Sequence, residues 1–470
     1  MHMMRDKDAK KPVDPQAMNM KSGGGLVNGG PMEQYFAKEG VDPLAHAFEG
    51  KLAVHPGVHA APMSDAEKAA TIERLSHAER KGKSVAYIHV PFCETHCLYC
   101  GFYNKYYNKD QSKIYTDTLL KELRMWSGKR AQDEGPIHAL YMGGGTPTAL
   151  EADDLQRILT AVHELLPLAN DCEVTVEGRI HNFTQEKMEA CFAGGANRFS
   201  LGVQSFNTEI RQSMKRVVDG DTACRQLELL QSYNQAAVVV DLIYGFPNQT
   251  MDIWLNDIKT AQSLNLDGAD CYQLNVYRST PLGKAIAAGK LPDSASIAMQ
   301  SAMFAASVEA MEKAFYRRLS MSHWARTSRE RNLYNLYMKG TACSLAFGPG
   351  AGGNLGGHFY MIESDYTKWQ DLVNDNVKPI AMIQKSPQHS PLYRAFAESM
   401  EQGHVHFTHF EHVFGVKLQE VLSPILEQWQ RVGLIELRGE YMVLTLAGQF
   451  WQVNLSQIIL HHLKSVLTVK

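Results

Sequence analysis

Residues 84–100 read SVAYIHVPFCETHCLYC. The stretch opens with a short apolar run rich in β-branched residues, which is typical of a buried strand, and a loop with three cysteines follows directly. Cys93, Cys97 and Cys100 have the spacing CxxxCxxC. Three thiolates on one short loop can hold three corners of a [4Fe–4S] cluster and leave the fourth iron open. Zinc, with His96 as its fourth ligand, and three buried cysteines without metal are the competing interpretations.

Downstream of this stretch, short β-rich runs alternate with longer amphipathic segments. This alternation predicts βα units and a parallel sheet. About six such units make an incomplete (β/α)6 barrel, so the predicted fold class is α/β. Chemistry in such folds gathers at the carboxyl ends of the strands. The predicted strands are residues 85–90, 137–142, 172–176, 198–201, 236–243 and 269–274.

The chain divides into five predicted parts. Residues 1–45 are rich in Lys, Gly, Met and Pro and are expected to form a flexible arm, while residues 46–83 contain a helical segment. The partial barrel is predicted over residues 84–320, followed by a glycine-rich connecting segment over 321–390. Residues 391–470 have a helix-then-hairpin order, which predicts a winged-helix-like appendage of the α+β type.

The composition of the 470 residues argues against several classes of function. Lys and Arg number 47 against 50 Asp and Glu, a formal net charge of -3. No basic excess points to nucleic acid or to an anionic membrane surface. We find neither an apolar run long enough to span a bilayer nor a signal peptide. Eight cysteines, three of them in one loop, indicate a thiolate site in a reducing cytoplasm.

Glycine and polar residues follow the predicted strands. The second strand runs into the sequence GGGTP at 143–147, where glycines let backbone N–H groups approach a charged ligand. Glu177 ends the third strand, Gln204 and Arg216 follow the fourth, and Asp241 closes the fifth. Carboxylate and amide groups suit ribose hydroxyls, and an arginine suits a carboxylate. Taken singly, each is as typical of a helix cap or a turn.

Together these motifs resemble the radical S-adenosylmethionine (SAM) superfamily, and within it the oxygen-independent coproporphyrinogen oxidase subfamily. The resemblance covers residues 84–455. It implies a [4Fe–4S] cluster on Cys93, Cys97 and Cys100, with SAM as the second cofactor at the open iron, where reduction gives a 5′-deoxyadenosyl radical. It further implies that SAM lies against Tyr87, Tyr99, Gly144, Gly145, Thr146, Glu177, Gln204, Arg216, Asp241 and Ile243.

The sequence after the third strand distinguishes among members of this subfamily. It reads EGRIHNF at 177–183, where the subfamily usually has Asn-Pro or Asp-Pro, and Phe102 stands where the oxidases carry a further cysteine. The string resembles the haem-utilisation branch, the anaerobic haem-degrading radical SAM methyltransferases or anaerobilin synthases. This implies a cytoplasmic enzyme that methylates haem, opens its ring and releases iron without oxygen. A haem-binding chaperone and a coproporphyrinogen III decarboxylase are the alternatives.

Haem as the substrate would need contacts that the cofactors do not explain. Arg179 and Arg318 are candidates for the propionates, and His181 and His323 for the iron, although ordinary loop or core roles fit each of them as well. The resemblance also implies an electron donor such as flavodoxin or a reduced pyridine nucleotide system. The physiological reductant, a second SAM site, the attacked meso carbon and the oligomeric state are left open.

Overall fold

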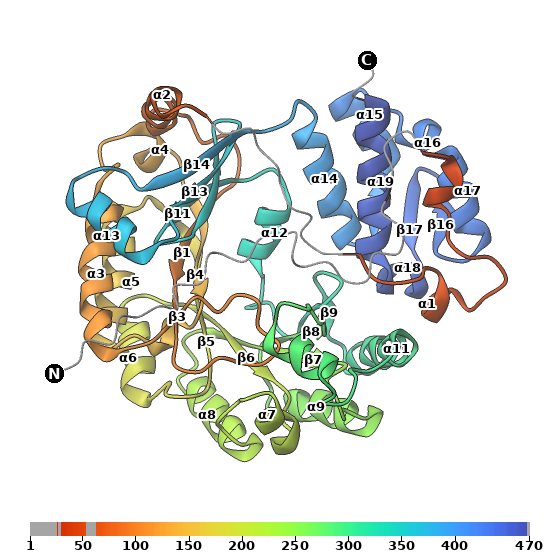
Figure 1. Ribbon diagram of the computed structural model, residues 1–470, viewed down its shortest axis with the longest axis horizontal. Coiled ribbons are helices and arrows are strands. Elements are labelled where there is room, and N and C mark those ends of the chain that lie inside the picture. The colour runs from red at the N-terminus through yellow and green to blue at the C-terminus, as the bar shows by residue number, and fades with distance from the viewer. Residues whose placement is uncertain (1–25, 27–29, 53–62, 468–470) are drawn as a thin grey trace.

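The computed structural model describes residue 26, residues 30–52 and residues 63–467 (Figure 1). Its centre is a twelve-stranded sheet, in which seven neighbouring strands run parallel. Among the described residues the two outermost strands do not pair, so the barrel is incomplete, as predicted. Apart from β11 (Cys343–Phe347), which lies beside β1, the parallel strands are, in spatial order, β1 (Ser84–Val90), β4 (Ile137–Gly144), β5 (Leu168–Gly178), β6 (Arg198–Gln204), β7 (Ala237–Tyr244) and β8 (Gly268–Gln273).

Helices connect these strands and cover one face of the sheet (Figure 1). Leu155, Ile158 and Leu159 form the buried stripe of α5 (Ala152–Leu165), and β7 is rich in apolar residues, as is typical of a strand that is covered on both faces. The α/β fold class is therefore confirmed. The other long helices of this layer are α3 (Lys109–Arg124), α6 (Gln185–Ala193), α8 (Gly220–Ser232), α9 (Met251–Ser263) and α11 (Ile297–Lys313). Three shorter helices stand between them in the chain, α4 (Arg130–Asp133), α7 (Thr208–Ser213) and α10 (Pro281–Ala287).

Residues 321–390, predicted as a connecting segment, instead extend the sheet at both edges. β10 (His323–Ala325) pairs antiparallel with β8 and with β9 (Arg317–Arg318), while β11 (Cys343–Phe347) pairs parallel with β1. The glycine-rich loop has a steric role, since Gly348 has a φ of 86° and a Cβ there would lie 2.4 Å from the His89 carbonyl oxygen. The segment also forms α12 (Leu333–Lys339), β12 (Gly352–Leu355), β13 (His358–Ile362), α13 (Tyr366–Asn374) and β14 (Ile380–Lys385).

The C-terminal part is a separate group of helices around a three-stranded antiparallel sheet (Figure 1). The strand order is β15–β17–β16, and the predicted hairpin corresponds to β16 and β17. Trp429 and Trp451 are fully buried at its centre. Its elements are α14 (Ser390–Glu401), β15 (His404–His406), α15 (Phe407–Phe414), α16 (Leu418–Val421), α17 (Ser423–Arg431), β16 (Ile435–Arg438), β17 (Tyr441–Leu444), α18 (Leu446–Phe450) and α19 (Gln452–Leu467).

The described part of the predicted N-terminal arm is packed against this C-terminal group. It forms η2 (Met32–Tyr35) and α1 (Pro43–His46), and Figure 1 shows α1 beside α18. The Trp429 indole donates a hydrogen bond to the Tyr35 carbonyl at 3.1 Å, and the Trp451 indole donates to the Pro43 carbonyl at 2.9 Å. The prediction of a flexible arm is thus wrong for residues 30–45, because composition alone does not reveal these distant partners. Residues 1–25 and 27–29 of that arm lie outside the described residues.

A helix of residues 65–76, α2 (Asp65–Ser76), precedes β1. Two short strands, β2 (Phe92–Cys93) and β3 (Lys105–Tyr106), and the 3-10 helix η3 (Pro147–Ala149) lie at the carboxyl ends of β1 and β4. In the described ranges, no helix is both long and apolar enough to cross a membrane.

Candidate functional site

The cysteine loop leaves the carboxyl end of β1 and returns on itself. β2 pairs with β3, so that the Tyr107 amide donates to the Cys93 carbonyl at 2.9 Å and fixes both ends of the loop. Cys93 and Cys97 are buried, and Cys100 is partly exposed. The Leu98 amide donates to the Met214 carbonyl at 3.3 Å, which ties the middle of the loop to the segment after α7. The three sulfurs are therefore presented by a constrained backbone.

Two arginines and a threonine surround the cysteine sulfurs. Arg179 donates to the Cys93 sulfur at 3.6 Å, Thr146 to the same sulfur at 3.5 Å, and Arg216 to the Cys97 sulfur at 3.7 Å. Burial raises the pKa of Cys93, whereas at Cys97 the two arginines outweigh burial and lower the pKa of the thiol. Positive charge beside the sulfurs favours thiolates, the form in which cysteine binds metal.

The donor set fits an iron–sulfur cluster. A [4Fe–4S] cluster takes each thiolate on a separate iron. Among the described residues, no three His, Cys, Asp or Glu side chains come close enough to share a single metal ion.

The glycine loop, residues 143–147, packs directly against the cysteine loop, residues 93–100. Gly144 has a φ of 112°, which favours glycine, and its amide donates to Glu177 Oε2 at 3.2 Å. The Gly145 amide donates to the Val90 carbonyl at 2.7 Å, and a Cβ on Gly145 would lie 2.4 Å from the Phe92 carbonyl oxygen. A side chain here would separate the two loops, which explains the glycines.

Glu177, Gln204 and Asp241 come together at the carboxyl ends of β5, β6 and β7. Asp241 lies opposite Gly202 of β6, beside a register shift, and accepts a hydrogen bond from Ser200 at 3.3 Å. Burial and then Asp241 raise the pKa of Glu177 to about 7, while burial and then Asp270 raise that of Asp241 to about 7. The two carboxyl groups are close enough to disfavour joint ionisation.

Gln204 shows that this region suits a polar ligand. It has a φ of 73°, and its side-chain Oε1 is shielded from solvent without a hydrogen-bond donor. Buried acceptors are rarely left unpaired, so a hydroxyl donor at this point would satisfy it. The residues present therefore fit the ribose of SAM.

The aromatic candidates lie on two sides of the site. The Tyr87 hydroxyl and His89 Nδ1 share a hydrogen bond of 3.0 Å. The Tyr87 ring stacks on that of Tyr334, with ring centroids 5.9 Å apart. The ring of Tyr99 lies 5.3 Å from that of Phe246, and Ile243 packs in the same apolar cluster. The structure therefore places Tyr87 inside the barrel and Tyr99 at its rim.

Sequence reasoning missed Tyr334, which reaches the barrel interior from α12. Its ring stacks on that of Tyr141, with ring centroids 4.8 Å apart, and also on that of Tyr87, so that the three rings form one aromatic stack. No local motif marks Tyr334, because its neighbours in space are about 200 residues away in sequence. Only the placement of α12 against β1 and β4 reveals it.

The four predicted haem contacts do not converge. Arg179 and His181 lie by the cysteine loop, the latter with its Nε2 3.9 Å from Glu94 Oε2. Arg318 instead donates to Gln449 of α18 at 2.5 Å and to the Met321 carbonyl at 2.7 Å. It joins the barrel to the C-terminal group.

His323 is enclosed in a buried charge network. Its Nδ1 lies 2.6 Å from Asp270 and its Nε2 2.9 Å from Glu330, which also pairs with Arg198. Burial alone would lower the pKa of His323, but the two carboxylates outweigh it and raise the pKa to about 9. With both ring nitrogens bonded, the side chain has no nitrogen left for iron.

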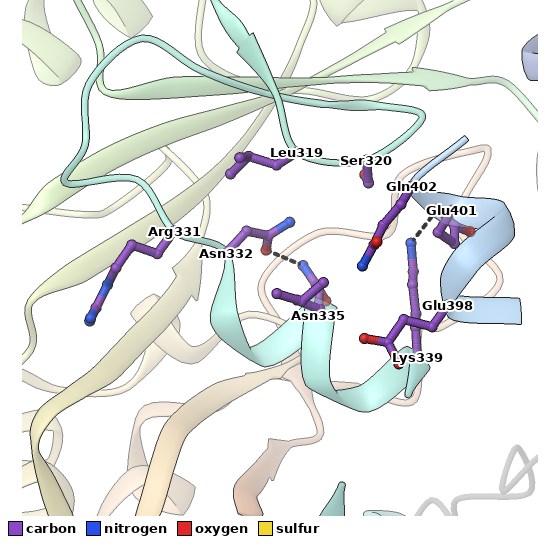
Figure 2. A pocket seen from close by; sticks show the side chains of 10 residues that line it. Leu319, Ser320, Arg331, Asn332, Asn335, Lys339, Glu398, Glu401 and Gln402 are labelled. Atoms are coloured by element: carbon purple, nitrogen blue, oxygen red, sulfur yellow. Dashed lines mark hydrogen bonds and ion pairs between the residues drawn. The ribbon is translucent and has the colours of Figure 1, made fainter. Parts of the chain in front are cut away.

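A separate pocket lies between α12 and α14 (Figure 2). Lys339 and Glu401 form an ion pair of 2.8 Å in it, and Arg331 reaches Asp171 at 3.2 Å. Asp171 belongs to the first half of β5, whereas Glu177 is near the end of that strand. The pocket is therefore at the opposite end of the sheet from the cysteine loop and is not part of the site.

A model of the Radical SAM superfamily matches residues 87–261, which run from β1 to α9 and contain the cysteine loop, the glycine loop and the polar strand ends. The fold and the site together define a radical SAM enzyme, whose cofactors are a [4Fe–4S] cluster and SAM. A solved structure, coproporphyrinogen III oxidase (HemN) from Escherichia coli, has the same fold, with a TM-score of 0.71. The match covers 85% of this chain and 96% of that chain at 18% identity.

Two proteins that are similar in sequence narrow the class of radical SAM enzyme to which the chain belongs. Anaerobilin synthase of Escherichia coli O157:H7 is 40% identical over 425 residues, which are 90% of this chain and 93% of the relative. The chain belongs to the anaerobilin synthase family. The heme chaperone HemW of Bacillus subtilis is 26% identical over 370 residues, covering 77% of this chain and 96% of the chaperone.

Proposed function

We propose that the protein is a radical SAM methyltransferase that opens the haem ring and releases iron without oxygen. The observation that carries this proposal is the 40% identity to anaerobilin synthase over nearly the full length of both chains. The site supports it, because the thiolates, the glycine loop and the polar strand ends lie together at one end of the sheet. The free cysteines suit a reducing cytoplasm.

The proposal assigns a role to each group of residues. Cys93, Cys97 and Cys100 hold the cluster, and the cluster with SAM supplies the 5′-deoxyadenosyl radical. The Gly144–Gly145–Thr146 backbone and Glu177 face the methionine amino group, and Arg216 faces its carboxylate. Gln204 and Asp241 bind the ribose hydroxyls, while Tyr87, Tyr99 and Ile243 line the cofactor. A second SAM donates the carbon that haem acquires, and flavodoxin or a reduced pyridine nucleotide system supplies electrons.

Exposed aromatic side chains beside the cysteine loop support a flat apolar substrate. Phe102 is 70% exposed and Tyr106 is 65% exposed, an unusual pair on a soluble surface. By contrast, Tyr107 and Phe246 are buried in the core. We propose that Phe102 and Tyr106 face the porphyrin as it approaches the cluster.

An anoxic assay with reconstituted protein, haem, SAM and a chemical reductant tests the proposal. We expect the haem Soret band to disappear and the product to have gained a methyl-derived carbon and lost its iron, as measured by mass spectrometry. Cys93→Ala should leave haem intact. Retention of the Soret band while SAM is cleaved would contradict the proposal.

The heme chaperone among the relatives makes haem binding without turnover the second candidate. A chaperone would bind haem tightly and return it unchanged. Recovery of intact haem, transferable to an apo-haemoprotein, would favour that function over degradation.

A further inference from the structure

The segment after β5 forms hydrogen bonds to the cysteine loop. Residues 179–183 turn between β5 and α6, and the Arg179 amide donates to Thr148 Oγ1 at 3.2 Å, which fixes the backbone at the start of the turn. Gly178 is needed for this contact, because a Cβ there would lie 2.4 Å from Thr148 Cγ2. Arg179 therefore starts from a constrained position, close to the glycine loop.

The Arg179 side chain reaches back over the cysteine loop. Its Nη1 donates to the Thr95 carbonyl at 2.9 Å and to Thr95 Oγ1 at 3.1 Å, and its Nη2 donates to the Cys93 sulfur at 3.6 Å. Asn182, in the left-handed conformation with a φ of 57°, donates to Glu94 Oε1 at 2.7 Å. Two side chains of the same turn thus hold the loop, but only Arg179 brings charge to a sulfur.

The guanidinium of Arg179 has a defined electrostatic effect at this distance. Reduction of a cluster adds one negative charge, and a cation or hydrogen-bond donor at a ligand sulfur favours the reduced state. Coulomb interaction at such a separation remains strong where water is partly excluded, as it is around the buried Cys93. Arg216 lies by Cys97 and also donates to the Gly202 carbonyl, so each of the two buried sulfurs has its own arginine.

We propose that Arg179 is a positioning residue that raises the reduction potential of the cluster through the Cys93 sulfur, and that Asn182 only holds the loop in place. The proposal rests on the cluster ligands assigned under the proposed function. It does not depend on haem as the substrate. It also gives the EGRIHNF string a role at the cluster rather than at the propionates.

A redox titration of the reconstituted full-length protein, followed by electron paramagnetic resonance without SAM or haem, tests this proposal. Arg179→Gln and Arg179→Met should hold as much iron and sulfide as the parent. Their equilibrium constant for reduction should fall about tenfold, a shift of about 59 mV to more negative potential for one electron. Arg179→Lys should recover part of the shift. Asn182→Ala, the matched control, should keep the parent potential.

The other outcomes are equally informative. An unchanged potential in a fully loaded Arg179→Gln or Arg179→Met protein would overturn the proposal. If neither neutral variant takes up a full cluster but Arg179→Lys does, the charge of Arg179 acts in cluster assembly and the proposed effect on the reduction potential is wrong. If Arg179→Lys fails as well, Arg179 acts through packing alone and the proposal is wrong. Failure of the haem assay would change none of these conclusions, because the redox titration uses neither SAM nor haem.

Discussion

Gln204 illustrates how one side chain can reveal a ligand. It lies where the register between β6 and β7 shifts, and bulges of this kind often re-aim a side chain next to an active site. Its buried Oε1 lacks a donor, which costs about 1–3 kcal/mol unless a ligand supplies one. The sequence made Gln204 a candidate because it follows the predicted strand 198–201, and in the structure β6 extends to Gln204 itself.

Replacement of Gln204 tests the ribose assignment. Gln204→Ala should weaken SAM binding about tenfold, the loss expected for one net hydrogen bond to a buried group, and should leave the iron content unchanged. Anoxic equilibrium dialysis with labelled SAM measures the affinity. Gln212→Ala, an exposed glutamine on α7, is the control. Equal SAM affinity in the Gln204 variant and the control would show that the amide does not touch SAM.

The raised pKa of Glu177 predicts a pH dependence of stability. Above pH 4.5 the unfolded chain has released this proton, whereas the folded chain keeps it up to a pH of about 7. The free energy of unfolding of the protein without SAM should therefore fall as the pH rises from about 4.5 to about 7. Asp241 acts in the same direction.

Urea unfolding at several pH values measures this slope. Glu177→Gln should flatten it without removing it, because Asp241 still titrates in the same range. A slope that is identical in the parent and in Glu177→Gln would mean that the pKa of Glu177 is the same in the folded and the unfolded chain.

His323 stabilises the barrel. His323→Ala would leave the buried Asp270 and Glu330 without their shared partner, and removal of one member of a buried ion network typically costs about 3–5 kcal/mol. Chemical unfolding should show this loss. The absorption spectrum of bound haem should stay that of the parent at equal occupancy. A changed haem spectrum would instead make His323 an iron ligand.

At the residue scale, the direction in which a side chain points was harder to predict than the place of its residue in the fold. Arg179, a predicted candidate for the propionates, follows β5 at the carboxyl end of the sheet, but its guanidinium turns toward Thr95 and Cys93. A long side chain on a short loop can reach either way, and only the placement of the neighbouring loop decides between the two. Tyr334 could not be found at all, since it comes from a helix that no local motif connects with the site.

At the scale of elements, the contact between the glycine loop and the cysteine loop determines the geometry of the site. Gly145→Ala would place a methyl group 2.4 Å from the Phe92 carbonyl oxygen and force the two loops apart. We expect at least a tenfold loss of SAM affinity with little change in circular dichroism. Gly50→Ala, where a Cβ meets nothing within 4 Å, is the control. Unchanged SAM affinity would show that the loops tolerate separation.

The parallel strands were predictable, and the strands at the edges of the sheet were not. β7 contains Val238, Val239 and Val240 between helical segments, a pattern that indicates a buried parallel strand by itself. β12 spans only Gly352–Leu355 and depends on pairing with β13. Its residues have little strand propensity of their own, so tertiary pairing rather than local sequence makes it a strand.

At the scale of the whole molecule, the described residues 30–52 pack against the C-terminal group. Tyr35 and Pro43 accept hydrogen bonds from Trp429 and Trp451 in the C-terminal group, so residues 30–52 join a core formed by residues about 400 positions later. Composition indicated a flexible arm because glycine and lysine favour loops, but composition carries no information about a partner so far away. The barrel and the C-terminal appendage, in contrast, could be predicted from local patterns, because strand–helix alternation and a helix-then-hairpin order are both visible in the sequence.

The metal content of the anoxically reconstituted protein shows whether Cys93, Cys97 and Cys100 hold an iron–sulfur cluster. We expect four iron and four acid-labile sulfide per chain, lost in Cys93→Ala, and an electron paramagnetic resonance signal of the reduced protein that changes when SAM is added. A chain that contains zinc, or iron without sulfide, or a signal indifferent to SAM would contradict it.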